Sequence, residues 1–256
     1  MILGVDCYSR QPPCDARGSG MTIDIDMVQG TEPADQKRGE TVQYVVSQIR
    51  QRIIEGRFVS GQRLIARDIS EDLGISRGPI REAFRRLAAD GIVELTPNRG
   101  AAVRQLSRKQ VDNLFQIREN LEGLAARLAA EHINEGSNLR IFTEVWETVR
   151  PKSVALPWHI FIQQNRLYHG TIVSISGNEQ LCELIGNLQL PIMMYQIGRA
   201  MLPENAEVSH QDHVRVAEAI LAGNSDAAEQ AMRRHLRRSH EWVKQLPDSA
   251  FKRKSE

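Results

Sequence analysis

The 256-residue chain lacks the features that mark membrane-spanning, secreted and disulfide-rich proteins. It has no run of 18 apolar residues, so we expect no transmembrane helix and no membrane partner. Its three cysteines are odd in number and form no C-x-x-C pair, which argues against a disulfide framework or a cysteine zinc finger. Met1–Gly4 is too short an apolar run for a secretory signal, so a cytoplasmic location is expected.

The chain as a whole has almost no net charge, but its parts differ in charge. The net charge of +1 by itself indicates no nucleic-acid partner. Residues 40–106, however, carry 11 basic and 8 acidic residues, a net +3, which leaves −2 for the remainder. With 41% hydrophobic and 25% charged residues, the composition is that of a globular protein with one or two cores. The pattern predicts a basic module joined to a mildly acidic one.

Periodicity and turn residues divide the chain into four segments. Residues 1–38 carry Gly, Pro, Ser and Asp throughout and are expected to form a disordered extension. Residues 39–106 and 107–246 each have the apolar periodicity of a folded domain. Residues 247–256 are expected to be a flexible tail.

The second segment has the element order of a winged helix-turn-helix domain. Apolar residues recur every three or four positions from Val42 to Ile53, and a second short helix is expected over Ala66–Leu73. After Gly74, Ser76 is placed to cap a third helix that ends near Gly91. Two short strands, Ile92–Leu95 and Ala101–Arg104, then form a hairpin around residues 96–100. Helix, helix, turn, helix and hairpin is the order of a DNA-binding winged helix.

Basic residues gather on the elements that such a domain turns toward DNA. The N-terminal end of the third helix enters the major groove, where Arg can bind guanine or a phosphate. A helix N-terminus and a wing with Arg and Gly are suited to the backbone and the minor groove. The alternative is a solvated helix face, and Glu82 is expected to cap or pair internally. The candidate DNA-binding residues are Arg67, Ser76, Arg77, Arg81, Arg99 and Gly100, with Arg85 one turn further on.

The third segment is expected to be entirely helical, so the fold class is mainly α. A long first helix has apolar residues from Val111 to Leu128 at steps of three or four. Breaks at Pro151, Gly177, Pro203 and Gly223 separate the later helices. The five further helices are expected near 138–149, 157–175, 179–201, 207–222 and 225–245, which gives a bundle of six.

Four residues of this bundle could hold a metal ion. Asn165 and His169 are four apart and therefore lie on one face of a helix. His213 and His235 lie on two later helices, and facing helices of a bundle can direct side chains to one ion. Three imidazoles and an oxygen suit Zn²⁺, and with less selectivity Ni²⁺, Mn²⁺ or Fe²⁺. The alternative is that these are ordinary core or surface histidines.

The winged-helix segment closely resembles that of GntR-type transcriptional regulators. The resemblance rests on G-R-F-V-S-G-Q-R-L (56–64), L-G-I-S-R-G-P-I-R-E-A-F-R-R-L (73–87) and D-G-I-V-E-L-T-P-N-R-G-A-A-V (90–103). It implies operator contacts by the positions that match Arg67, Arg77, Arg81 and Gly100. Gly78 stands where many relatives have Thr, which removes one hydroxyl that could contact a phosphate.

The helical segment is similar to the FCD-type ligand-binding domain of the FadR-like branch, and its six helices to the VanR subgroup. The matching runs are I-R-E-N-L-E-G-L-A-A-R-L-A-A (117–130), N-R-L-Y-H-G-T-I-V-S-I-S-G-N (165–178), H-V-R-V-A-E-A-I-L-A-G-N (213–224) and A-A-E-Q-A-M-R-R-H-L (227–236). The resemblance implies a divalent metal beneath an effector, held by Asn165, His169, His213 and His235. The first of these is usually Asp, so the missing charge predicts weaker binding here.

The resemblance also places Arg118 in the effector pocket, where it could pair with a carboxylate. A salt bridge to Glu122, one helical turn on, is the equal alternative. Together these features predict a homodimeric repressor that binds an inverted repeat in operator DNA and responds to a small organic acid.

Two other functions stay open at this point. One is a regulator with a purely structural bundle, and the other is a metal-dependent hydrolase. No H-E-x-x-H, P-loop or G-x-G-x-x-G motif occurs, so no catalytic residue is assigned and an enzyme is not expected.

Overall fold

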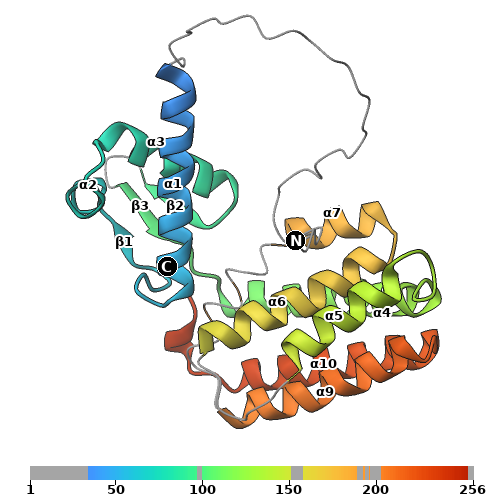
Figure 1. Ribbon diagram of the computed structural model, residues 1–256. Helices are drawn as coiled ribbons and strands as arrows, with labels where there is room; N and C mark the ends of the chain where they lie inside the picture. Colours follow the sequence, from blue (N-terminus) through green and yellow to red (C-terminus); the bar gives the residue numbers. More distant parts are fainter. Residues whose placement is uncertain are drawn as a thin grey trace, which may run out of the picture.

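The computed structural model describes residues 34–96, 100–150, 158–188, 193, 196 and 203–252. A winged helix and a helical bundle follow each other along the chain (Figure 1). The winged helix contains α1 (Ala34–Ile54), β1 (Arg63–Leu64), α2 (Ala66–Leu73), α3 (Arg77–Ala89), β2 (Val93–Thr96) and β3 (Gly100–Val103). The bundle contains α4 (Arg108–Glu131), α5 (Asn138–Val149), α6 (Trp158–Ile175), α7 (Glu179–Asn187), α9 (Pro203–Leu221) and α10 (Ser225–Lys244), followed by the short 3₁₀ helix η1 (Asp248–Ala250).

The predicted helix-turn-helix is present, and its turn depends on one glycine. Gly74 ends α2 in the left-handed conformation, with φ of 66°, and its N–H donates to the carbonyl of Ser70. Ser76 is extended and begins α3. The buried residues of α3, Ile80, Ala83, Phe84 and Leu87, follow the helical period and pack against α1 and the sheet. The opposite side of α3 is thereby left to solvent.

The wing is a three-stranded antiparallel sheet in the order β1-β3-β2. The two predicted strands are confirmed, each within one residue, and pair from Val93 with Val103 to Thr96 with Gly100. The sequence did not predict β1, which pairs Leu64 with Ala101 on the other edge of β3. Two residues are too few to produce an alternating pattern, so only the pairing reveals this strand.

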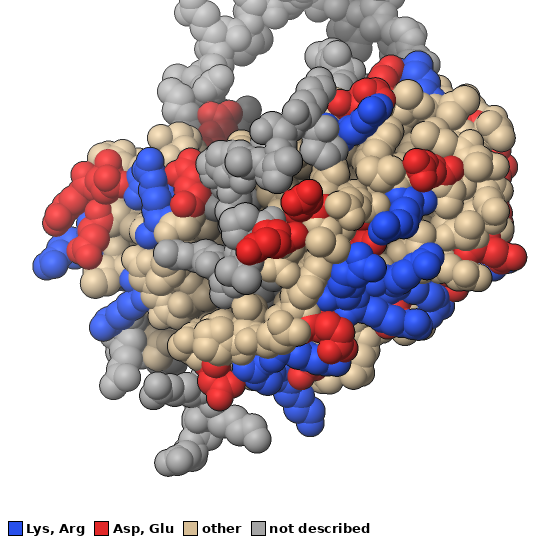
Figure 2. Space-filling model, turned by 90° about the horizontal axis from the view of Figure 1, so that it is seen from below, with Lys and Arg blue, Asp and Glu red and all other residues tan. Residues whose placement is uncertain are grey.

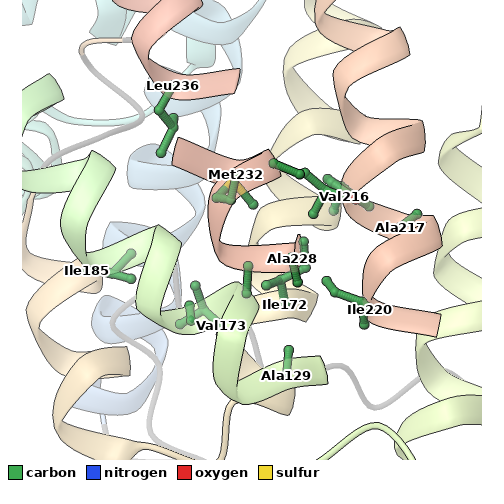
Figure 3. Packing of buried hydrophobic residues seen from close by; sticks show 14 of the residues in the cluster. Ala129, Ile172, Val173, Ile185, Val216, Ala217, Ile220, Ala228, Met232 and Leu236 are labelled. Carbon is green, nitrogen blue, oxygen red and sulfur yellow. The ribbon is translucent and has the colours of Figure 1, made fainter. Parts of the chain in front are cut away.

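In the helical bundle, α4 packs against α6, α7, α9 and α10. Small residues on α4, including Ala125 and Ala129, let α10 approach closely, since their side chains add little width. Figure 3 shows α10 residues Ala228, Met232 and Leu236 beside residues of the neighbouring helices. The neighbours are Ala129 of α4, Ile172 and Val173 of α6, Ile185 of α7, and Val216, Ala217 and Ile220 of α9. Within the described ranges, no helix is both long and apolar enough to cross a bilayer.

Three segment boundaries differ from those expected. The helix α1 begins at Ala34, inside the predicted extension 1–38, because Ala, Gln, Lys and Arg favour helix at that point. The helix predicted over 179–201 ends at Asn187; Met193 and Gln196 are again helical, and the rest of that stretch lies outside the described residues.

The expected flexible tail is wrong for residues 247–252. Phe251 is buried in the bundle core, and the backbone N–H of Lys252 donates to the carbonyl of Leu106. Phe251 packs into the core of the bundle, and the composition of the segment alone does not reveal this long-range contact. Residues 1–33 and 253–256 lie outside the described part of the chain.

Gly100 is the glycine of the wing on which a substitution would act most directly. Its φ is 86°, and an added Cβ would lie 3.2 Å from the carbonyl oxygen of Leu64. We expect Gly100→Ala to lower the free energy of unfolding by about 1–2 kcal/mol, because it strains the backbone and crowds β1. Gly78→Ala is the matched control: it lies in α3 with nothing within 4 Å of an added Cβ. Urea denaturation should find that control equally or more stable than the parent chain. Equal effects of the two changes would contradict the strained wing.

Candidate nucleic-acid interface and metal centre

The N-terminal turn of α3 presents three of the predicted DNA-binding residues to solvent. Ser76, Arg77 and Arg81 are all exposed, and Ser76 makes no side-chain capping bond. In the stretches that the structure describes, neither arginine is within ion-pair distance of a carboxylate. Because the apolar face of α3 is buried in the domain, these side chains and the free N–H groups of the first turn point outward together. The arrangement can accept phosphates and base edges.

The remaining basic residues are held to different degrees. The exposed Arg67 at the start of α2 lies 3.5 Å from Asp68 and 3.8 Å from Glu71, contacts too weak to prevent it from binding a phosphate. The next arginine of α3, Arg85, is paired at 2.9 Å with Glu82, as expected for that glutamate. This pairing makes Arg85 a weaker candidate than Arg77 or Arg81.

The wing contributes Gly100 at the start of β3, in the left-handed region that glycine adopts without strain. Arg99 lies outside the described residues. Gly78 is exposed on α3, consistent with a position that could face a phosphate but has no hydroxyl to offer.

The arginines of α10 serve a different purpose. Seen from below, Figure 2 shows a group of Lys and Arg side chains bordered by acidic ones. Arg233 and Arg237 of α10 both reach Glu119 of α4, at 3.8 and 2.6 Å. Arg127 of α4 pairs in turn with Asp226 of α10 at 2.7 Å. These ion pairs join α4 and α10 within the bundle.

The structure brings three of the four predicted metal ligands together. His169 of α6, His213 of α9 and His235 of α10 are buried, with exposed fractions of 1%, 4% and 3%. Their Nε2 atoms lie 3.2 Å apart between His169 and His213 and 3.3 Å apart between His213 and His235. Zn–N bonds of about 2.0–2.1 Å place nitrogens on a tetrahedral ion about 3.3–3.4 Å apart. The three imidazoles therefore fit a divalent ion.

Glu122 fixes how His169 presents its ring to this centre. The Nδ1 of His169 lies 2.5 Å from one Glu122 oxygen, and Arg118 donates to the other at 2.6 Å. Burial alone would raise the pKa of Glu122, but Arg118 and His169 lower it to about 2. Glu122 is thus an anion that can only accept, so Nδ1 of His169 carries the proton. The Nε2 lone pair is left for a ligand.

Asp212 lies beside His235 at this centre. One of its oxygens accepts from Arg215 at 2.8 Å and from Arg238 at 3.0 Å, and the other lies 3.9 Å from Nδ1 of His235. Burial lowers the pKa of His235 to about 4, although Asp212 acts against this. Burial, together with His235 and His169, also holds the pKa of His213 well below its ordinary value. These imidazoles are therefore neutral at neutral pH, the form that binds a metal.

The other two predicted residues are placed differently. Asn165 lies one turn before His169 on α6 and is partly exposed, so its role as a fourth ligand stays a prediction. Arg118 had two possible partners, an effector carboxylate or Glu122, and in the structure it forms the salt bridge to Glu122. Sequence reasoning missed Glu122 and Asp212 as neighbours of the histidines. The only available signals were an acid four residues after Arg118 and an acid directly before His213.

Comparison with known proteins assigns families to both parts of the chain. The family model described as "Bacterial regulatory proteins, gntR family" matches residues 41–103, and that described as "FCD domain" matches residues 113–238. A protein of Paenarthrobacter nicotinovorans named "Probable D-xylose utilization operon transcriptional repressor" is 30% identical over 201 residues, covering 75% of this chain and 85% of the relative. The transcriptional repressor RspR of Escherichia coli K12 is 26% identical over 201 residues, covering 77% and 86%.

A solved structure has the same fold. The structure of McbR/YncC from E. coli superposes with a TM-score of 0.66 at 22% sequence identity, covering 80% of this chain and 97% of that protein. The arrangement of winged helix and helical bundle is therefore shared with it.

The buried histidines and Glu122 should make the metal-free chain sensitive to acid. A neutral buried His235, with a pKa of about 4 in the fold and an ordinary pKa of 6.5, contributes stability above pH 6.5 that is lost as the pH falls toward 4. Glu122, with a pKa of about 2, contributes stability that is lost below pH 4.5. With a chelator present, we expect urea denaturation to find on the order of 2–3 kcal/mol lost between pH 6.5 and 4. His235→Asn should reduce this loss, and an unchanged pH profile in that variant would contradict the neutral buried imidazole.

Proposed function

The chain belongs to the GntR family of bacterial regulatory proteins, and we propose that it is a repressor whose affinity for operator DNA is set by a small carboxylate bound beside a divalent metal. It is a DNA-binding transcriptional regulator, with an FCD domain after the winged helix. The families and relatives that it matches are transcriptional regulators and not enzymes, which sets the hydrolase alternative aside. We place its action in the cytoplasm, where bacterial operators lie.

The observation that carries the DNA-binding role is the exposed first turn of α3. Arg77 and Arg81 are one helical turn apart, and the buried Ile80 between them fixes the orientation of the helix on the domain. A helix held in this way can enter the major groove by its N-terminal end, with Ser76 and Arg67 on the flanking phosphates. Gly100 and Arg99 are then assigned to the wing contact.

Dimerisation is supported by an apolar stripe on α4. Leu114, Ile117, Leu121, Leu124 and Leu128 step by three and four residues, which keeps them on one side of the helix. Ile117 is 44% exposed and Leu124 is 38% exposed, and the other three are partly buried against the bundle core. A stripe of this kind suits the same stripe of a second copy, and a two-fold dimer requires an inverted repeat in the operator.

The observation that carries the metal is the approach of three imidazole nitrogens in a buried site. Lone pairs directed at one point in the protein interior repel each other unless a cation or protons lie between them. The low pKa values of His213 and His235 disfavour protons, so a divalent cation is the better occupant. This argument also weighs against a purely structural bundle. The proposed ligands are His169, His213, His235 and Asn165, and zinc is the metal that three imidazoles favour.

A carboxylate is the proposed effector because a divalent ion on three imidazoles retains positions that anionic oxygens can fill. Arg118 is buried beside this centre, but Glu122 already occupies its guanidinium. An effector carboxylate could pair with Arg118 only by displacing Glu122. We therefore assign the metal as the first contact of the effector and Arg118 as its second, conditional contact.

Replacing the α3 arginines should weaken operator binding. We expect Arg77→Ala and Arg81→Ala each to cost about 1–3 kcal/mol of specific binding, the usual contribution of a base contact, in fluorescence anisotropy with operator DNA. Arg85→Ala is the matched control on the same helix and should cost less, because Arg85 is paired with Glu82. Footprinting should find an inverted repeat. If both variants bind like the parent chain, the recognition helix is misassigned.

Replacing the histidines should remove the metal and leave DNA binding intact. We expect calorimetric titration with ZnCl₂ to find no tight site in His169→Ala, His213→Ala or His235→Ala, whereas Asn165→Asp tightens binding by adding a charge to the ligand set. Glu122→Gln should weaken binding about 10–100-fold, as loss of a carboxylate behind a metal-bound histidine does.

His240→Ala is the matched control, because His240 is also on α10 but pairs with Asp112. It should bind Zn²⁺ like the parent chain. Small carboxylates should raise the melting temperature only with Zn²⁺ present. Equal affinity in Asn165→Asp and the parent would contradict coordination by Asn165.

A further inference from the structure

Residues 247–252, which we call the C-terminal clasp, lie between the two domains. Figure 1 shows this red segment beside the base of the winged helix and above the end of α10. Phe251 is 4% exposed and belongs to the core of the helical domain. The core of the winged helix is a separate cluster. A short segment with one residue buried in the helical core thus lies beside the winged helix.

The clasp holds the connection between β3 and α4 at Leu106. The N–H of Leu106 donates to Oε1 of Gln196 at 2.6 Å. The carbonyl of Leu106 accepts both from Nε2 of Gln196 at 2.7 Å and from the N–H of Lys252 at 3.0 Å. Gln196 also donates to the carbonyl of Ala250 at 2.9 Å. Every backbone polar group of Leu106 is therefore occupied, and its side chain is buried.

The clasp is also joined to the start of α4. Arg108 donates to the carbonyl of Leu246 at 2.7 Å and to Asp248 at 2.8 Å. Its guanidinium lies over the ring of Phe251, 4.3 Å from the ring centroid. The first turn of α4 and the clasp are consequently one unit.

An ion pair extends this unit to the winged helix. Nζ of Lys252 donates to Glu94 on β2 at 2.8 Å, across 158 residues of sequence. The clasp therefore contacts the helical domain, the connection and the wing at once. Among the described residues, Ile92 also joins the two parts, since it packs against both cores.

We propose that the C-terminal clasp fixes the orientation of the winged helix relative to the helical domain and that operator affinity depends on it. The inference rests on the proposed dimeric binding to an inverted repeat, in which two recognition helices must keep one spacing. A winged helix free to turn about Leu106 would have to be ordered each time it binds DNA. The entropy cost of that ordering would weaken operator binding. The clasp is the element that removes this freedom beforehand.

Two shortened chains test the proposal. A chain ending at Leu246 lacks the clasp, and a chain ending at Lys252 retains it and is the control. We expect the first to bind operator at least tenfold more weakly than the second, with Zn²⁺ affinity changed by less than twofold. Trypsin should cut the connection at Arg104 or Arg108 at least fivefold faster in the chain ending at Leu246. Cleavage requires no DNA, so a failure of the proposed operator binding is distinguishable from a failure of the clasp. Equal cleavage rates in the two chains would overturn the proposal.

A double-mutant cycle covers the case in which loss of Phe251 unfolds the bundle. Glu94→Gln and Lys252→Gln should each raise the cleavage rate about two- to fivefold, the effect of losing an exposed ion pair. Glu94→Gln also removes the approach of Arg104 to Glu94 at 3.9 Å. The double variant should therefore cleave no faster than Glu94→Gln alone, because the contact between Lys252 and Glu94 is already lost there. Additive effects, or none in either single variant, would show that the wing is not held by this pair and would overturn the proposal.

Discussion

The close packing of neighbouring helices on α4 is the constraint on which the positions of the buried histidines depend. Alanines such as Ala125 and Ala129 add little width, so α6, α9 and α10 can each lie against α4. The three helices each contribute one histidine, and α4 itself contributes Glu122. A larger residue at one of these alanines would move a helix axis, and the nitrogen atoms at its far side would move with it. The geometry of the candidate metal centre is thus set by residues that do not touch it.

The pair formed by Arg118 and Glu122 ties stability to the same centre. Both side chains are almost fully buried, and charges in the protein interior are stable only with well-placed partners. One oxygen of Glu122 accepts a hydrogen bond from Arg118, and the other accepts one from His169. The same carboxylate thus neutralises a buried charge and orients a candidate metal ligand. Removal of one member of a buried pair usually costs about 3–5 kcal/mol. Protonation of Glu122 would therefore destabilise the fold. The ionised Glu122 in turn fixes the tautomer of His169.

Local patterns predicted most of the fold, and long-range contacts account for what they missed. The helix-turn-helix, both longer strands and most helices of the bundle follow from periodicity, Gly74 and Ser76, which act within a few residues. His169, His213 and His235 were found because helical spacing and resemblance agree at those positions. Glu122 pairs with a residue 47 positions away, and β1 exists only through its pairing with β3. The periodicity of one segment carries no information about such distant partners. The burial of Phe251 could not be predicted for the same reason.

The contact between Lys252 and Glu94 has a consequence for the order of events during synthesis. The winged helix has its own core and local contacts, so it can fold soon after residues 34–103 leave the ribosome. The residues that hold it in place, 247–252, are translated about 150 residues later, which at about 5–20 residues per second is roughly 7–30 seconds. During that interval a folded winged helix is attached to an unfinished bundle, and neither the bond from Lys252 to Leu106 nor that from Lys252 to Glu94 has formed. In a nascent chain, the winged helix can therefore be folded well before its orientation relative to the helical domain is fixed.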